Sequence, residues 1–77
     1  MTVKIVVHQE LLPLGVTSED VAAAITVENF AEVEVEKLQK AFVRLVNLIA
    51  RGAGADSPEY YEACVEAASC GIDVVEL

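Results

Sequence analysis

Apolar side chains recur at every second position at the start of the chain. Val3, Ile5 and Val7 follow this spacing, and most residues around them are β-branched. Alternation with a period of two is typical of a β-strand, so we expect one over residues 2–8. A second β-branched stretch, residues 72–75, predicts a short strand that can pair with the first.

A helix-start signal follows the first predicted strand. Pro13 and Gly15 predict a turn, because proline cannot donate to a sheet and glycine suits a turn. Thr17 or Ser18 can then cap a short helix, and two acids follow in its first turn. We expect this helix near residues 19–25.

The middle of the chain carries a clear helical period. Apolar residues step by three and four positions at Val35, Leu38, Phe42, Leu45 and Ile49. We expect a long helix that starts at about Glu28 or Glu34 and ends at Ala50. Residues 30–36 fit either the first turns of this helix or a short strand, because glutamates and apolar residues alternate there.

The segment RGAGADSPEYYEA, residues 51–63, has the features of a corner between two helices. Gly52 suits the left-handed conformation that ends a helix, and Ser57 before Pro58 suits the start of the next one. Gly71 is expected to end that second helix.

The last predicted helix has an apolar and an acidic face. The apolar face is expected to hold Tyr61, Cys64, Val65 and Ala68. The acidic face is expected to hold Glu59, Glu62, Glu66 and Ser69. On this spacing Tyr61 belongs to the core, whereas Tyr60 is offset and partly exposed.

Residues 54–57 read GADS, which resembles the attachment motif of acyl carrier proteins, also acidic and near this length. The resemblance implies phosphopantetheine on Ser57. In that family the serine starts a helix near the middle of the chain and an apolar residue follows. Here Pro58 follows and only 20 residues remain. A carrier or enzyme, acting through Ser57 or Cys64, is therefore the third interpretation.

These elements predict an α+β fold in a single small domain, residues 1–77. Short N- and C-terminal strands pack against a long central helix and two shorter helices. A third short strand over residues 32–36 is the main variant.

The charge balance narrows the choice of partner. The 77 residues include 13 acidic and 5 basic side chains, giving a net charge of −8. Direct nucleic-acid binding and anionic membranes are disfavoured by this sign, and a protein with a basic surface is favoured. The longest apolar stretch, residues 41–50, is too short to span a membrane. With two cysteines and no secretion signal, we expect a cytoplasmic protein.

Residues for chemistry are few. His8 is the single histidine, and no ligands stand at metal-binding spacing around it. We therefore expect no enzyme activity, catalytic residue, cofactor or metal.

Two rows of carboxylates are the most suggestive surface feature. Glu28, Glu32 and Glu36 form one row if their segment is helical. The predicted partner-binding residues belong to the other row and its neighbouring aromatic: Glu59, Glu62, Glu66 and Tyr60. The favoured function is a small, acidic, non-enzymatic binding module. It would be an inhibitor similar in size and charge to anti-CRISPR proteins, occupying a basic surface of its partner.

The central helix is apolar around most of its circumference, and the remaining elements are expected to be too few to cover it. We therefore expect a homodimer in which two copies share this helix. The predicted interface residues are Phe42, Val43, Val46, Leu48 and Ile49. The alternative function is a structural or regulatory subunit of a homo-oligomer or obligate complex.

Overall fold

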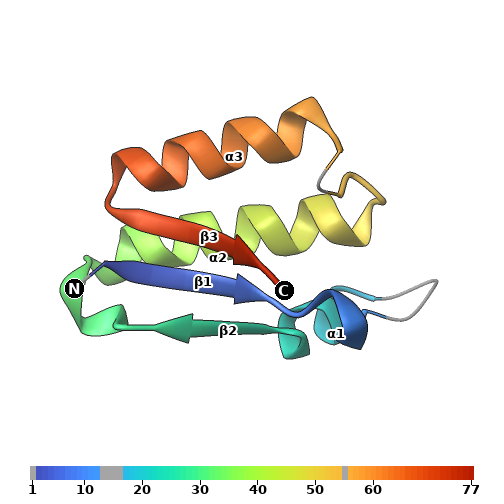
Figure 1. Ribbon diagram of the computed structural model, residues 1–77, viewed down its shortest axis with the longest axis horizontal. Helices are drawn as coiled ribbons and strands as arrows, with labels where there is room; N and C mark the ends of the chain where they lie inside the picture. The colour runs from blue at the N-terminus through green and yellow to red at the C-terminus, as the bar shows by residue number, and fades with distance from the viewer. Residues whose placement is uncertain (1, 13–16, 55) are drawn as a thin grey trace.

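The computed structural model describes residues 2–12, 17–54 and 56–77, and within them the chain forms one mixed three-stranded sheet with helices packed beside it. The strands are β1 (Val3–Val7), β2 (Ile25–Glu28) and β3 (Ile72–Glu76). Helix α2 (Val35–Ala50) runs along the direction of the strands and passes partly behind β3, and α3 (Pro58–Ser69) lies on the β3 side of the sheet (Figure 1). This arrangement is an α+β fold, as the sequence predicts.

The first and last strands of the chain are neighbours in the sheet. Strand β1 is central, antiparallel to β2 and parallel to β3, in the order β2-β1-β3. Ile5 lies opposite Val27 on one side and Val74 on the other. The predicted pairing of the terminal strands is therefore confirmed. Its parallel sense requires a long crossover, which α2 and α3 supply.

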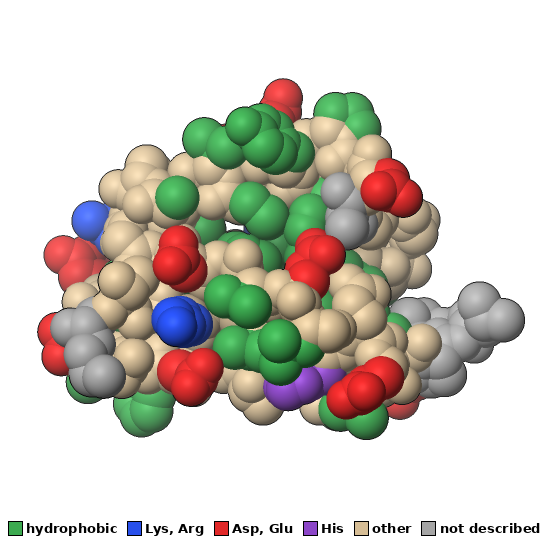
Figure 2. Space-filling model, viewed as in Figure 1, with side chains coloured by type: hydrophobic (Ala, Val, Ile, Leu, Met, Phe, Trp, Pro, Cys, Tyr) green, Lys and Arg blue, Asp and Glu red, His purple; other side chains and the backbone are tan. Residues whose placement is uncertain are grey.

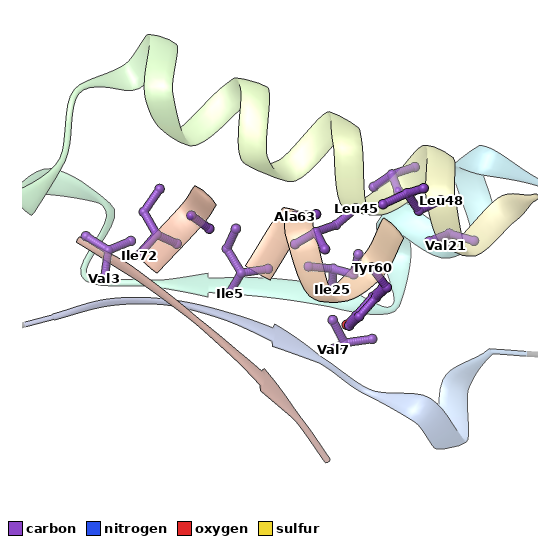
Figure 3. Close-up of a cluster of buried hydrophobic side chains, with 12 residues drawn as sticks. Val3, Ile5, Val7, Val21, Ile25, Leu45, Leu48, Tyr60, Ala63 and Ile72 are labelled. Carbon is purple, nitrogen blue, oxygen red and sulfur yellow. The ribbon is translucent and has the colours of Figure 1, made fainter. Parts of the chain in front are cut away.

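The core lies between the sheet and the helices. The period-two side chains of β1, Val3, Ile5 and Val7, all point into it (Figure 3). Side chains from α1 (Ser18–Ala23), α2 and α3 meet them there. Burying each of these aliphatic side chains stabilises the fold by about 1.5–3 kcal/mol.

The short helix is followed at once by a strand, and here two predictions are wrong. The helix ends at Ala23, and Ile25 begins β2. The variant strand over residues 32–36 does not form: a 3-10 turn, η2 (Phe30–Glu32), precedes α2. Position 25 belongs to a strand because its side chain, with that of Val27, adds to the core beside β1.

Local signals at the start of α1 agree with the sequence. Thr17 caps the helix: its hydroxyl accepts from the Asp20 backbone N–H, and the Asp20 carboxylate accepts from the Thr17 N–H. The predicted turn at Pro13 and Gly15 lies outside the described residues.

Helix α2 begins at the later of its two predicted starts, after Glu34. It ends in a Schellman motif. The Ala53 N–H donates to the Leu48 carbonyl at 2.8 Å, and the Gly52 N–H donates to the Ile49 carbonyl at 3.0 Å. This closure requires a left-handed residue, and Gly52 has φ +87°. The predicted role of Gly52 is confirmed.

Helix α3 has the predicted start but not the predicted buried face. Tyr60, Ala63 and Ala67 are buried, with Tyr60 3% exposed, whereas Tyr61 is 69% exposed. The assignment of Tyr60 to the surface and Tyr61 to the core is therefore wrong. Apolar residues occur on both sides of this helix, so its period does not select a face. The position of β3 against α3 selects the Tyr60 side.

The predicted dimer interface on α2 is also changed by the fold. Val46 and Leu48 are buried within the chain, and Phe42 and Ile49 are half-buried against the same core. Of the five predicted interface residues only Val43 is exposed, at 49%. The expectation of an uncovered apolar strip is wrong, because α1 and α3 pack against α2 from within the same chain.

Candidate functional site

The outward side of α3 presents apolar side chains to solvent. Tyr61 is 69% and Val65 50% exposed, and these residues are one helical turn apart. Ala68 continues the same stripe and is also exposed. Figure 2 shows hydrophobic side chains gathered over α3 at the top of the view. We call Tyr61, Glu62, Val65 and Ala68 the α3 outer face.

Two of the three predicted partner-binding carboxylates on α3 are engaged within the chain. Arg51 Nη2 donates to Glu59 Oε2 at 3.3 Å, and Arg44 Nη1 donates to Glu66 Oε2. Both pairs are exposed, so each contributes about 0.2–1 kcal/mol to stability while it connects α3 with α2. Among the described residues Glu62 makes no ion pair. It is therefore the acid of this row that is free for a partner.

The fourth predicted contact, Tyr60, is not available to a partner. Its hydroxyl is buried and has no hydrogen-bond partner among the described residues. Burial and the nearby Glu76 carboxylate raise the pKa of this phenol. Tyr61, which the sequence pattern placed in the core, occupies the exposed position that was expected for Tyr60. Two adjacent tyrosines on a helix indicate that one is buried and the other exposed, but helical spacing alone did not show which of the two is buried.

The other predicted carboxylate row does not form one stripe. Glu28 lies on β2 opposite Lys4, Glu32 is in η2, and Glu36 is in the first turn of α2. Two apolar side chains in the same segment, Phe30 and Val35, are largely exposed. Neither was predicted to lie at the surface, and the helical period had placed Val35 on the apolar stripe of the long helix.

The serine, cysteine and histidine side chains that could carry chemistry lie in positions where they support the fold. The Ser57 hydroxyl accepts from the Glu59 backbone N–H at 3.2 Å and so caps α3 as predicted. Cys64 is half-buried, and burial together with Glu76 raises the pKa of its thiol, which disfavours the thiolate nucleophile. His8 Nε2 lies 3.2 Å from the Thr26 hydroxyl. Within the described ranges no three metal-ligating side chains gather.

Comparisons with known proteins give no match to a family model, to a curated protein or to a solved structure. In the part of the chain that the structure describes, no helix has the length and apolar character needed to cross a bilayer.

Proposed function

We propose that this protein is an acidic, non-enzymatic binding module that occupies a basic surface of another protein through the α3 outer face. One observation carries this proposal: Tyr61 and Val65 are exposed side by side next to Glu62, a carboxylate that no described cation neutralises. Tyrosine is enriched among the residues that dominate binding energy, and apolar neighbours exclude water around it.

The negative charge of the chain supports a partner whose surface is positively charged. A net charge of −8 attracts a basic surface over the Debye length, about 8 Å at physiological salt. Glu62 would then give a directed contact at the rim of the apolar stripe. The expected partner surface is a patch of lysine or arginine around an apolar pocket that accepts the Tyr61 ring.

The α3 outer face is also held in place before binding. The Ser57 cap, the buried Tyr60 and the two ion pairs to α2 fix the helix on the rest of the chain. A helix that is already ordered loses little conformational freedom on binding, which favours affinity. Occupying a partner's basic surface would block its ordinary anionic ligand, and the protein would thus act as an inhibitor.

The test is differential capture from a lysate of the native cell, read by quantitative mass spectrometry. Tagged wild type, Tyr61→Ala and Glu62→Lys are compared with two control variants. Leu11→Ala removes an exposed apolar side chain elsewhere, and Glu10→Lys makes the same charge change elsewhere. We expect a basic protein that both α3 variants lose and both controls retain. Equal loss with Glu10→Lys, or retention by all variants, would contradict the proposal.

A further inference from the structure

An open groove of about 1260 Å³ runs along the outer side of α2, between the starts of α1 and α3. Three basic side chains line it, Lys40, Arg44 and Arg51, together with the amide of Asn47 and the apolar Val43. We call these five residues the α2 groove. They are distinct from the residues of the α3 outer face, so a ligand bound here would be separate from the partner of the proposed function.

The α2 groove concentrates positive charge in a strongly acidic chain. The sequence has 5 basic and 13 acidic side chains, and three of the basic ones are among the described residues that line this groove. The acidic side chain in the same described lining is Glu59, and it is paired with Arg51. The groove therefore differs in sign from the molecule as a whole.

The cations of the α2 groove keep free hydrogen-bond donors. Each guanidinium has five N–H groups, whereas the ion pairs engage one nitrogen of Arg44 and one of Arg51. Lys40 makes no ion pair within the described part of the chain. An anion can thus bind without breaking either contact between α2 and α3.

The donors stand in one row. Lys40, Arg44, Asn47 and Arg51 are separated by four, three and four positions, which places them along one side of the helix. Neighbouring members are about 4.5–6 Å apart along the axis, a spacing that one carboxylate or phosphate group can bridge. Val43 lies beside this row and offers an apolar contact.

We propose that the α2 groove binds a small organic anion, with its carboxylate or phosphate group between Lys40 and Arg44 and its apolar body on Val43. A small anion is favoured over a nucleic acid or another polyanion because charges in salt solution act only over a short distance. Salt screens the remote acids beyond about 8 Å, so a small ligand responds to the local cations, whereas a long polyanion also meets the net charge of −8.

The experiment is a two-dimensional amide NMR titration of the ¹⁵N-labelled chain at constant ionic strength. The probes are phenyl phosphate and benzoate, each compared with inorganic phosphate or acetate as the anionic group alone. We expect saturable shifts at Lys40, Val43, Arg44 and Asn47, with tighter binding of the aromatic member of each pair. Comparison of the two pairs identifies whether phosphate or carboxylate is preferred.

Matched variants test the location. Lys40→Gln should weaken binding about tenfold, the effect of losing one charge-assisted contact. Lys4→Gln removes the same charge from β1 and should leave binding unchanged. Val43→Ser should remove the preference for the aromatic probes. Shifts that do not saturate, or equal losses in Lys40→Gln and Lys4→Gln, would overturn the proposal, and the spectra themselves report whether each variant is folded.

Discussion

The Ser57 hydroxyl satisfies the Glu59 N–H, one of the donors left without a partner at the start of α3. Replacing this residue by alanine, Ser57→Ala, should lower the free energy of unfolding by about 1 kcal/mol. Ser57→Asp keeps an acceptor at the cap and should lose much less. Urea denaturation followed by circular dichroism measures both. A loss of partner capture in folded Ser57→Ala at unchanged stability would instead indicate chemistry at this hydroxyl.

Ser57 also decides between a binding module and a carrier. Because its hydroxyl is used as a cap, we expect the protein expressed in a bacterial host to have the mass of its unmodified chain. Intact-mass spectrometry checks this, with a known carrier protein expressed in parallel as a positive control. A phosphopantetheine adduct that disappears in Ser57→Ala would favour the carrier over the binding module.

Tyr60 provides a test of a buried polar atom. Its hydroxyl is removed from water without a hydrogen-bond partner among the described residues, which costs free energy in the folded state. Tyr60→Phe should therefore leave the free energy of unfolding unchanged or raise it by about 1 kcal/mol. A comparable loss of stability in Tyr60→Phe would show that the hydroxyl bonds to the nearby Glu76 carboxylate in solution.

The same phenol makes stability depend on alkaline pH. Burial first, and Glu76 second, raise the pKa of Tyr60 in the folded state above its unfolded value of about 10. Above about pH 10 the folded chain then keeps the Tyr60 proton while the unfolded chain loses it. The contribution of Tyr60 to stability is therefore complete below that pH and is lost as the pH rises. Urea midpoints between pH 8 and 11 should show this loss, and Tyr60→Phe should reduce it. Tyr61→Phe, which changes the exposed tyrosine, should leave it in place.

At the scale of elements, the end of α2 depends on one glycine. Gly52 has φ +87°, and an added Cβ would meet no heavy atom within 4 Å. Gly52→Ala should therefore cost about 1 kcal/mol through backbone strain alone. Gly54 is the matched control, since its φ lies outside the left-handed range and the space around it is equally open. Gly54→Ala should be neutral or slightly stabilising in thermal unfolding. Equal effects of the two changes would contradict the Schellman closure.

The strands and helices show where element-level prediction works. Alternating β-branched residues identified β1, and helix-ending residues identified the corner between α2 and α3. Strand β2 was missed because its four residues directly follow α1, and a short apolar run of this kind also fits the end of a helix. It becomes a strand because β1 offers a hydrogen-bonding edge and a core for Ile25 and Val27.

At the scale of the whole molecule, the homodimer stays a prediction. Of the five residues predicted for its interface, only Val43 is exposed on the folded chain. Val46 is buried within its own chain, whereas Val43 is exposed on the same helix. Val46→Glu should unfold the chain, because it buries a charge without a partner. Val43→Glu should stay folded, and it should convert any dimer formed through α2 to a monomer.

Sedimentation equilibrium and circular dichroism separate these outcomes for wild type and both variants. A folded Val46→Glu of monomer mass, beside a wild type of dimer mass, would show that Val46 faces a second copy rather than the core. A wild type of dimer mass with an equally dimeric Val43→Glu would place the dimer interface away from the outer side of α2.

The sequence by itself determined features that depend on a few neighbouring residues. These features are the cap at Ser57, a cap at Thr17 or Ser18, the left-handed Gly52 and the period of β1. All are short-range effects of backbone geometry and hydrogen bonding. The acid-rich composition likewise limits the class of partner without reference to the fold.

Only the tertiary structure decided which apolar surfaces are covered and which charges are free. Tyr60 and Tyr61 are adjacent in sequence, and the docking of α3 on β3 buries the first and exposes the second. The pairing of Glu59 and Glu66 with α2 likewise leaves Glu62 as the free acid of its row among the described residues. Burial and ion pairing depend on contacts between elements that are distant in sequence. The periodicity of one helix does not indicate where its neighbours pack.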